Sequence, residues 1–409
     1  MTTEVFVLGG AQTDFARNWS REGLSLFDLF SSAVQQGLAT TGLEAADIEV
    51  GHVGNFVAEL FTGQGMLGGF FGHVHPDFAG MPASRHEGAC ASGSLAVLAA
   101  MADLQSGRYG LACVAGIELM RNVPGQTAAE HLGAAAWVGR ESLDATYLWP
   151  AQFSDLAEEY DRRYGLRYQH LAEISRINFD NASHNPNAQT RNWVFNEQSF
   201  TRDDEANPVI EGWMRKHDCG QVTDGAAVVF LANAERARDY ARTHGLSLDS
   251  IPRIRGWGHT TAPLMLQTKL RESADQEYVF PWVRKAITDA YARAGLAGPG
   301  ELDAIETHDC FSITEYMAIE HFGITPPGRA WTAIEEGRVA MSGDIPVNPS
   351  GGLIGLGHPV GATGVRMLLD AHRQTSGTAG DNQVDGATTV GTYNVGGSGT
   401  TNVSFMVGV

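Results

Sequence analysis

The sequence predicts a mixed α/β protein made of two similar halves. Short apolar stretches typical of buried strands alternate along the chain with longer stretches that carry helical periodicity. A pattern of helix, short connection and strand at residues 29–48 returns in the second half as residues 283–305. In each half, a sharp turn that opens another helix comes later in the chain. The length of 409 residues exceeds one ordinary domain and agrees with two such halves.

The individual elements follow from composition and periodicity. Runs rich in Val, Ile, Leu and Ala predict buried strands, and apolar residues spaced three and four apart predict helices. In chain order, we expect a strand at 2–8, a helix at 29–42, a helix opening at Cys90, strands at 111–116 and 222–230, a helix at 283–295, a strand around Ile305, a helix at 313–321, and final strands at 387–393 and 401–407.

A segment of different character separates the two halves. Residues 119–217 hold half of the tryptophans, namely Trp137, Trp149, Trp193 and Trp213, and a helical stretch at 171–183 that stops before a proline. Such an aromatic cluster forms either a small core of its own or a cap over a site. We therefore expect a first half at 1–118 and 218–250, an inserted loop or cap domain at 119–217, and a second half at 251–409.

Composition excludes several classes of protein. The formal net charge of -19 disfavours nucleic acid and anionic membranes as partners, because both need a basic face. No run of 18 uncharged apolar residues predicts a membrane span, and no basic, apolar leader opens the chain. Four cysteines without regular spacing argue against a disulfide framework and fit a reducing compartment. We expect a cytoplasmic protein.

Cys90 is the first candidate for chemistry. It lies in His86-Glu87-Gly88-Ala89-Cys90-Ala91-Ser92-Gly93, at the start of an apolar helical run. The free N–H groups and the positive end of the dipole at a helix N-terminus are expected to lower the pKa of such a thiol. The alternative is a small buried hydrophobe, which is the interpretation we favour for Cys113 and Cys219 in or beside apolar strands.

Two histidines offer partners for that thiol. His358 lies in Gly355-Leu356-Gly357-His358-Pro359-Val360-Gly361, again just ahead of a helix, and a cysteine with a histidine base is a nucleophilic pair. His308, Asp309 and Cys310 meet at one turn between a strand and a helix, where open α/β sheets place their chemistry. A zinc site is the rival interpretation, but no second pair of ligands at zinc-site spacing is present, so no metal is expected.

These motifs resemble those of thiolases over nearly the whole chain, and within that family the sterol-carrier-protein type. Cys90-Ala91-Ser92 resembles the nucleophile motif, and Gly357-His358-Pro359 resembles the base motif. His308-Asp309-Cys310-Phe311 matches the loop that distinguishes the sterol-carrier-protein type. Most thiolases carry Cys-x-Gly near the C-terminus, but this chain has Asn394-Val395-Gly396 there. In that type the His-Asp-Cys-Phe loop supplies the second cysteine instead.

The resemblance implies a fold and an activity. The fold would be two βαβαβαββ halves in layers of α-β-α-β-α with an inserted cap. The activity would be that of an acetyl-CoA acetyltransferase or 3-ketoacyl-CoA thiolase, cleaving a 3-oxoacyl-CoA with coenzyme A, or the reverse condensation. Coenzyme A would be a substrate, with no cofactor, and the chain would form a homodimer or homotetramer through its first-half sheet.

The resemblance also implies residue roles. Cys90 would attack the 3-keto carbon after His358 accepts its proton, and the backbone N–H groups of Cys90 and Gly396 would hold the resulting oxyanion. His358 and His308 would stabilise the thioester enolate, and Cys310 would protonate it and then deprotonate coenzyme A. Asp309 would orient its neighbours.

Substrate contacts are expected from two further places. Met265 and Leu266, in a loop from which thiolases contact substrate, could line an acyl tunnel or pack in the core. Polyanionic coenzyme A needs a local cationic patch on this acidic chain, and the candidates are Arg215 with Lys216, or Arg162, Arg163 and Arg167.

Two alternatives stay open at the level of the sequence. A condensing 3-ketoacyl synthase also uses a cysteine, with two histidines or a histidine and an asparagine, but the His308-Asp309-Cys310 loop fits a thiolase better. A catalytically idle acyl-CoA-binding or scaffold subunit is the other alternative, and the departure at Asn394 favours it. The presence of Cys90, Cys310 and His358 argues against it, because a mere binder needs no activated thiol.

Overall fold

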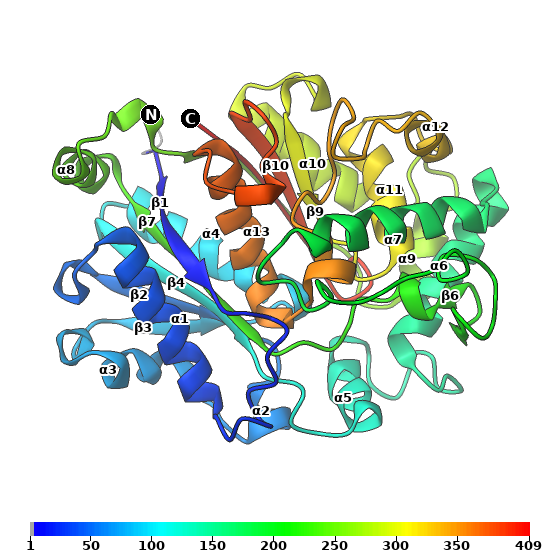
Figure 1. The fold of residues 1–409 in the computed structure, drawn as a ribbon, viewed down its shortest axis with the longest axis horizontal. Coiled ribbons are helices and arrows are strands. Elements are labelled where there is room, and N and C mark those ends of the chain that lie inside the picture. Colours follow the sequence, from blue (N-terminus) through cyan, green and yellow to red (C-terminus); the bar gives the residue numbers. More distant parts are fainter. Residues whose placement is uncertain (1–3) are drawn as a thin grey trace.

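The computed structural model describes residues 4–409, and it confirms the mixed α/β fold (Figure 1). Nine strands form one sheet in the order β3-β2-β4-β7-β1-β8-β11-β10-β9. The strands are β1 (Phe6–Gln12), β2 (Val50–Gly54), β3 (Ala83–His86), β4 (Leu111–Glu118), β7 (Gly225–Ala232), β8 (Arg253–Thr261), β9 (Ala304–Thr307), β10 (Thr389–Gly396) and β11 (Thr401–Gly408). Residues 2 and 3 of the first predicted strand lie outside the described residues.

The two halves of this sheet repeat one pattern. In the first half β2 pairs parallel with β3 and β4, and β7 runs antiparallel between β4 and β1. In the second half β9 pairs parallel with β10, and β11 runs antiparallel between β10 and β8. An isolated parallel bridge between Ile305 and Val347 takes the place that β3 has in the first half. The repeated pattern of helix and strand in the sequence thus corresponds to a repeated strand topology in the two halves.

The junction between the halves is narrow. Only Phe6 and Arg253 pair across β1 and β8 in the ladder, with backbone hydrogen bonds from Val7 N to the Pro252 carbonyl (2.8 Å) and from Ile254 N to the Val5 carbonyl (2.9 Å). The first half therefore contributes five strands to the sheet and the second half four, with little pairing between the two groups. Other elements must hold the halves together.

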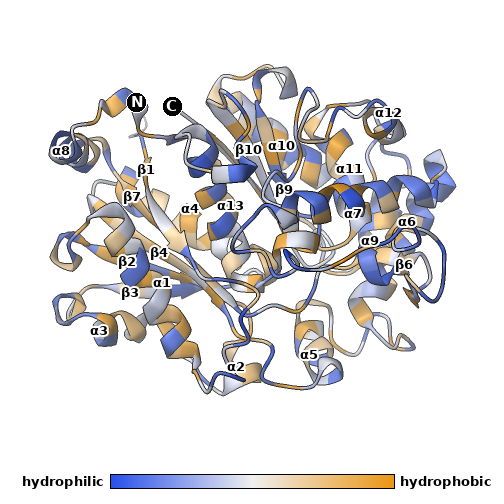
Figure 2. Cartoon of the chain, in the orientation of Figure 1, coloured by the Kyte–Doolittle hydropathy of each residue, from blue (hydrophilic) through white to orange (hydrophobic). Residues whose placement is uncertain are grey.

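The helices are α1 (Leu26–Thr41), α2 (Ala58–Thr62), α3 (Phe71–Val74), α4 (Ser92–Gln105), α8 (Ala234–His244), α9 (Leu266–Glu272), α10 (Pro281–Ala294), α11 (Ser312–Phe322), α12 (Ala330–Glu335) and α13 (Thr363–Thr375), besides those of the insertion. Helices α4 and α13 pack between the halves: α4 contacts β2 and β4, and α13 contacts strands of both halves. Helix α1 packs on β1 and β7, and α10 packs on β8 and β11. Figure 2 shows a strongly hydrophilic α8 at the periphery.

Local sequence explains where these helices begin and end. Ser25 and Asp28 form a capping box at the start of α1, and Gly42 ends that helix in the left-handed conformation that glycine tolerates best. Pro281 opens α10 and Gly295 ends it in the same way. The two helices begin with different signals but end in the same way, at a glycine in the left-handed conformation.

The insertion contains α5 (Gly125–Leu132), α6 (Leu148–Tyr164), α7 (Tyr168–Ser183), β5 (Val209–Glu211) and β6 (Met214–Arg215). Its residues Leu156 and Tyr160 belong to the same apolar cluster as Ile313 and Tyr316 of α11. Tyr160 also donates a hydrogen bond to the Glu320 carboxylate. The insertion thus packs against the second half instead of forming a core of its own, while the exact domain boundaries at residues 118, 217 and 250 stay predictions.

Within residues 4–409, no helix has both the length and the apolar character that a membrane crossing requires.

Candidate active site

Cys90 lies on a strained turn between β3 and α4. The preceding residue, Ala89, has φ +51°, which is unusual for a residue with a side chain. Ser92 stabilises the turn, because its Oγ accepts a hydrogen bond from Gly88 N (3.0 Å) and donates one to the Ala89 carbonyl (2.6 Å). The turn presents the Cys90 side chain at the N-terminal end of α4, as the sequence predicts.

His358 lies on the equivalent turn of the second half, ahead of α13. Its backbone N–H donates to Thr223 Oγ1 (3.0 Å), which ties the turn to the segment that precedes β7. Its Nδ1 lies 2.7 Å from Thr363 Oγ1, whose own proton goes to the Pro359 carbonyl at 3.1 Å. The hydroxyl therefore accepts from Nδ1–H, which leaves a lone pair on Nε2 of His358. A histidine in this tautomer can accept a proton.

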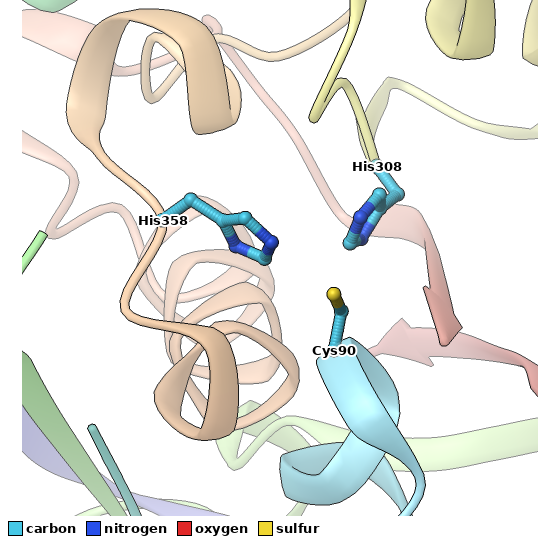
Figure 3. Close-up of side chains that lie close together, drawn as sticks. All are labelled: Cys90, His308 and His358. Carbon is cyan, nitrogen blue, oxygen red and sulfur yellow. The ribbon is translucent and has the colours of Figure 1, made fainter. Parts of the chain in front are cut away.

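His308 follows β9 and completes a cluster with the other two side chains. Ligand atoms of Cys90, His308 and His358 all lie within 4.8 Å of one another, and the two rings are perpendicular with centroids 5.1 Å apart. Figure 3 shows the Cys90 sulfur pointing toward the space between the two rings, which come from separate segments of the chain. The structure thus brings three of the predicted site residues together.

Cys310 faces the same space from the strand-to-helix turn after β9. A cavity of about 420 Å³ is lined by Cys90, His358 and Cys310 together. Its apolar wall includes Phe56 of the first half, Met120, Leu132, Trp149 and Phe153 of the insertion, and Phe311 of the second half. Phe311 stacks on Phe153 of α6 with centroids 4.5 Å apart, so the insertion packs directly on the loop that carries His308 and Cys310. The cavity has the size and apolar lining of a site for a small organic ligand.

The position of Asp309 fits an orienting role. Its carboxylate accepts hydrogen bonds from Leu353 N (2.6 Å), Ile354 N (3.1 Å) and Asn178 Nδ2 (2.8 Å). These bonds connect the His308 loop to the turn that precedes His358 and to α7. Burial raises the pKa of Asp309 to about 6, while the backbone N–H groups of Leu353 and Ile354 oppose this.

The electrostatics of Cys90 correct one expectation from the sequence. Burial raises the pKa of the Cys90 thiol to about 12, and the backbone N–H of Gly397, which hydrogen-bonds the sulfur, offsets this only in part. The expected lowering of the Cys90 pKa by the helix N-terminus is wrong, because loss of solvation outweighs the dipole and the N–H groups. Cys90 is a thiol at rest and needs a base to become a nucleophile.

The two histidines are neutral. Burial and the positive charge of Arg366 lower the pKa of His358 to about 3. Burial, His358 and Arg366 hold the pKa of His308 well below its usual range. For Cys310, burial raises the thiol pKa well above its usual value. The site therefore rests without net charge on these four side chains, which suits an apolar ligand.

Two residues next to the site were missed by sequence reasoning. Glu118, fully buried at the end of β4, accepts hydrogen bonds from Phe56 N (2.9 Å) and from Gly361 N (3.0 Å) on the His358 turn. Burial raises the pKa of Glu118 to about 7. A charged residue at the end of an entirely apolar strand was the available signal. Gly397 was missed because the Asn394-Val395-Gly396 motif ends one residue before it.

Gly396 itself lies in β10, where an added Cβ would stand 2.0 Å from the Gly88 carbonyl oxygen. Only glycine allows this close approach between β10 and the Cys90 turn. The N–H group that faces the Cys90 sulfur belongs to Gly397, which also lines the cavity. The role of Gly396 as an oxyanion donor stays a prediction, and Gly397 is a second candidate beside it.

Of the residues predicted to contact substrate, some line the cavity and others do not. Neither Met265 nor Leu266 lines the cavity; Leu266 is 2% exposed within the core of the second half, in agreement with the core-packing alternative. Lys216 is exposed and lines the cavity. The four arginines are engaged by acids: Arg162 and Arg163 with Glu159, Arg167 with Glu335, and Arg215 with Asp204.

Comparisons with known proteins agree with the fold and the site. Residues 5–235 match the thiolase N-terminal domain, and residues 267–408 match the thiolase C-terminal domain-like family. An acetyl-CoA acetyltransferase of Methanothermobacter thermautotrophicus is 33% identical over 97% of both chains. Sterol carrier protein 2 of Oryctolagus cuniculus is 26% identical over 96% of this chain and 70% of its own length.

Solved structures show the same architecture. The Ltp2-ChsH2(DUF35) aldolase superposes with a TM-score of 0.76 at 21% identity over 99% of this chain and 98% of its own. Human mitochondrial 3-ketoacyl-CoA thiolase in complex with CoA superposes with a TM-score of 0.71 at 15% identity, over 99% of this chain and 98% of its own. The fold and the cysteine–histidine site define an acyltransferase enzyme with a thiolase fold. The chain belongs to the thiolase family.

Proposed function

We propose that the protein is an acyl-CoA C-acyltransferase that cleaves a 3-oxoacyl-CoA with coenzyme A, or runs the reverse Claisen condensation, through an acyl group on Cys90. The observation that carries this proposal is the convergence of Cys90, His308 and His358 within 4.8 Å beside a cavity that Cys310 also lines. The reaction needs no cofactor, because coenzyme A enters as a substrate.

The first half-reaction begins with proton transfer. Nε2 of His358 takes the Cys90 proton, and the thiolate attacks the 3-keto carbon. Backbone N–H groups at Cys90 and at Gly396 or Gly397 hold the oxyanion. The bond between C2 and C3 then breaks, and its electron pair leaves with the enolate of acetyl-CoA. The side chains of His308 and His358 stabilise that enolate, and the Cys310 thiol protonates its carbon.

The second half-reaction restores the enzyme. The Cys310 thiolate takes the proton of the incoming coenzyme A thiol, whose sulfur attacks the acyl carbon on Cys90. The carbon–sulfur bond to Cys90 breaks, and the leaving thiolate recovers its proton from His358. Because burial holds the pKa of Cys310 well above its usual value, the thiol still carries its proton when the enolate forms, and the thiolate that remains is a strong base in the second half-reaction.

The cavity supports an acyl-CoA ligand. Its wall is apolar near Phe56, Met120 and Trp149, where an acyl chain fits, while the exposed Lys216 offers a positive charge to coenzyme A. Lys216 is the best supported of the cationic candidates, because the arginines are already engaged by carboxylates. The M. thermautotrophicus relative is named for the same type of transfer.

The proposal is tested by mass spectrometry of the intact protein after brief exposure to acetyl-CoA and to a longer 3-oxoacyl-CoA. Wild type, Cys90→Ala and Cys310→Ala are compared. We expect an acyl adduct on Cys90 that accumulates in Cys310→Ala, because the enolate of the first half-reaction can take its proton from water whereas the second half-reaction lacks its base. No adduct is expected in Cys90→Ala. Intact acyl-CoA binding without an adduct in any variant would instead indicate the idle acyl-CoA-binding subunit.

A further inference from the structure

Asn394 occupies the place where most thiolases have a cysteine, and in this chain it contacts both catalytic loops. The side chain is 1% exposed on β10. Its Nδ2 donates to the Cys90 carbonyl (3.1 Å) and lies 3.0 Å from Nδ1 of His308. Its Oδ1 accepts a hydrogen bond from Ser94 Oγ (2.8 Å) on α4.

These contacts determine the orientation of the amide. A backbone carbonyl can only accept, so the group facing the Cys90 carbonyl must be the NH₂ of Asn394. The Ser94 hydroxyl donates to Oδ1 and confirms that orientation from the other side. The second N–H of the same NH₂ group is then directed at Nδ1 of His308. The backbone N–H of Val395 also faces this nitrogen, at 3.5 Å.

The orientation of the amide selects the tautomer of His308. A ring nitrogen that faces two N–H donors must present its lone pair, so the single proton of the neutral imidazole is on Nε2. Nε2 has no hydrogen-bond partner among residues 4–409 although it is buried. The ring points toward the space that Figure 3 shows between His308, His358 and Cys90. A buried donor without a partner costs free energy unless a ligand uses it.

We infer that Asn394 is a positioning residue that, together with Ser94, holds His308 in its Nε2–H tautomer and so directs a neutral hydrogen-bond donor at the oxygen of the substrate. His358 has the opposite tautomer, because Thr363 accepts from its Nδ1–H. The two histidines thus have different roles: His358 accepts the Cys90 proton, and His308 donates a hydrogen bond to an oxyanion. The catalytic consequence rests on the proposed acyl transfer, whereas the tautomer itself does not.

The assignment also bears on metal binding. Cys90, His308 and His358 are a set of side chains that could hold a metal ion by distance alone. To bind it through Nε2, His308 would have to move its proton to Nδ1, against the N–H groups of Asn394 and Val395. This conflict disfavours a metal at the site.

The decisive variant is Asn394→Asp, which keeps the shape of the side chain but replaces its NH₂ donor by an acceptor. Histidine-selective ¹⁵N NMR at pH 7, with His308 assigned by comparison with His308→Gln, shows which ring nitrogen carries the proton. We expect Nε2–H in the wild type, and Nδ1–H or a doubly protonated ring in Asn394→Asp. An Nδ1–H wild type, or an unchanged tautomer in Asn394→Asp, would overturn the inference.

Kinetics provide the second measurement. Loss of one oxyanion donor typically costs on the order of 10² to 10³ in kcat, and we expect a loss of this size in Asn394→Asp, with KM nearly unchanged. Ser94→Ala, which only loosens the amide, should keep the Nε2–H tautomer and lose much less activity; equal losses in the two variants would contradict the inference. Asn382→Asp is the control for burying a carboxylate, because Asn382 also donates to two carbonyls, those of Asn181 and Pro349, but lies in another cavity.

The two proposals fail in different ways. Nε2–H in the wild type without acyl transfer from any acyl-CoA would overturn the proposed function and leave the tautomer assignment standing. Acyl transfer with Nδ1–H in the wild type would overturn the role of Asn394 and leave the proposed function standing.

Discussion

At the scale of single residues, the resting state of Cys90 governs how the site works. The thiol opens onto the cavity, yet burial raises its pKa to about 12. The imidazole of His358, whose pKa burial lowers to about 3, is too weak a base to keep the thiolate formed at neutral pH. In the proposed reaction, we therefore expect the proton to move only when bound substrate stabilises the product of the transfer. Such a thiol is protected from adventitious oxidation, because the thiolate is the reactive form.

This resting state predicts the pH dependence of Cys90 alkylation. The thiolate fraction rises about tenfold for each pH unit below the pKa. The rate of iodoacetamide addition to Cys90, followed by peptide mass spectrometry, should therefore keep rising from pH 7 to 9 without a plateau. Cys90→Ala is the control that removes the labelled peptide. A plateau below pH 8 would show instead a thiolate–imidazolium pair at rest.

At the scale of elements, a buried lysine fixes the turn that follows Gly396 and Gly397. Lys269 of α9 is fully buried, and its Nζ donates to the Leu264 carbonyl and to Thr400 Oγ1, both at 2.9 Å. Thr400 N in turn donates to the Gly396 carbonyl (3.0 Å), which closes the turn between β10 and β11. Helix α9 thus braces the glycines beside Cys90 without touching the cavity itself.

Burial lowers the pKa of Lys269 to about 7, although Glu141 opposes this. Its usual value in an unfolded chain is near 10.5. Between these two values the unfolded state binds a proton that the folded state does not, so Lys269 makes the folded protein more stable as the pH rises from 7 toward 10.5. The effect approaches about 1.4 kcal/mol per pH unit for one proton.

The variant Lys269→Met tests whether Lys269 makes the folded protein more stable as the pH rises. The difference in Tm, wild type minus variant, should grow in favour of the wild type between pH 7.5 and 9.5, because methionine has no proton to lose. The subtraction removes the contributions of the other cysteines, tyrosines and lysines. A difference that stays constant over this range would mean that the ammonium keeps its ordinary pKa in the fold.

At the scale of the whole molecule, the sheet has an open edge at β3. Pro82 and His86 direct their carbonyls at β2, where they accept from Gly51 N (2.9 Å) and Asn55 N (3.3 Å). In a parallel pair alternate residues face the neighbour, so the backbone groups of Ala83 and Arg85 point away from β2. An edge of this kind is a template for pairing with another chain. We propose that a second copy pairs here, in a homodimer or homotetramer.

Ala83→Pro tests the assembly, because it removes an outward N–H at the first residue of the strand without removing a bond to β2. Sedimentation should give a multiple of the 43.8 kDa chain for the wild type and for the control Ala83→Ser, and a single chain for Ala83→Pro. Far-UV circular dichroism checks that the variant stays folded. An assembly of unchanged size in Ala83→Pro would exclude the β3 edge as its interface.

Much of the architecture could be predicted from local signals. The repeated helix and strand pattern predicted α1 and α10, each of which ends at a glycine that directly follows it in the sequence. The turns at Cys90 and His358 were predicted because glycines and small residues precede helices there. The course of the insertion was less predictable, since Leu156 and Tyr160 carry apolar character that could serve a separate core or the second half equally well.

The sequence by itself determined the fold class, the family resemblance and the candidates Cys90, His308, Cys310 and His358, because motifs and periodicity are local properties of the chain. Only the tertiary structure decided how these groups behave. The pKa of Cys90 depends on how completely the folded protein removes water around it. The contact between Asn394 and His308 joins residues 86 positions apart, and that between Asn394 and the Cys90 carbonyl spans 304. Solvation and long-range hydrogen bonds arise only from packing, which no local pattern encodes.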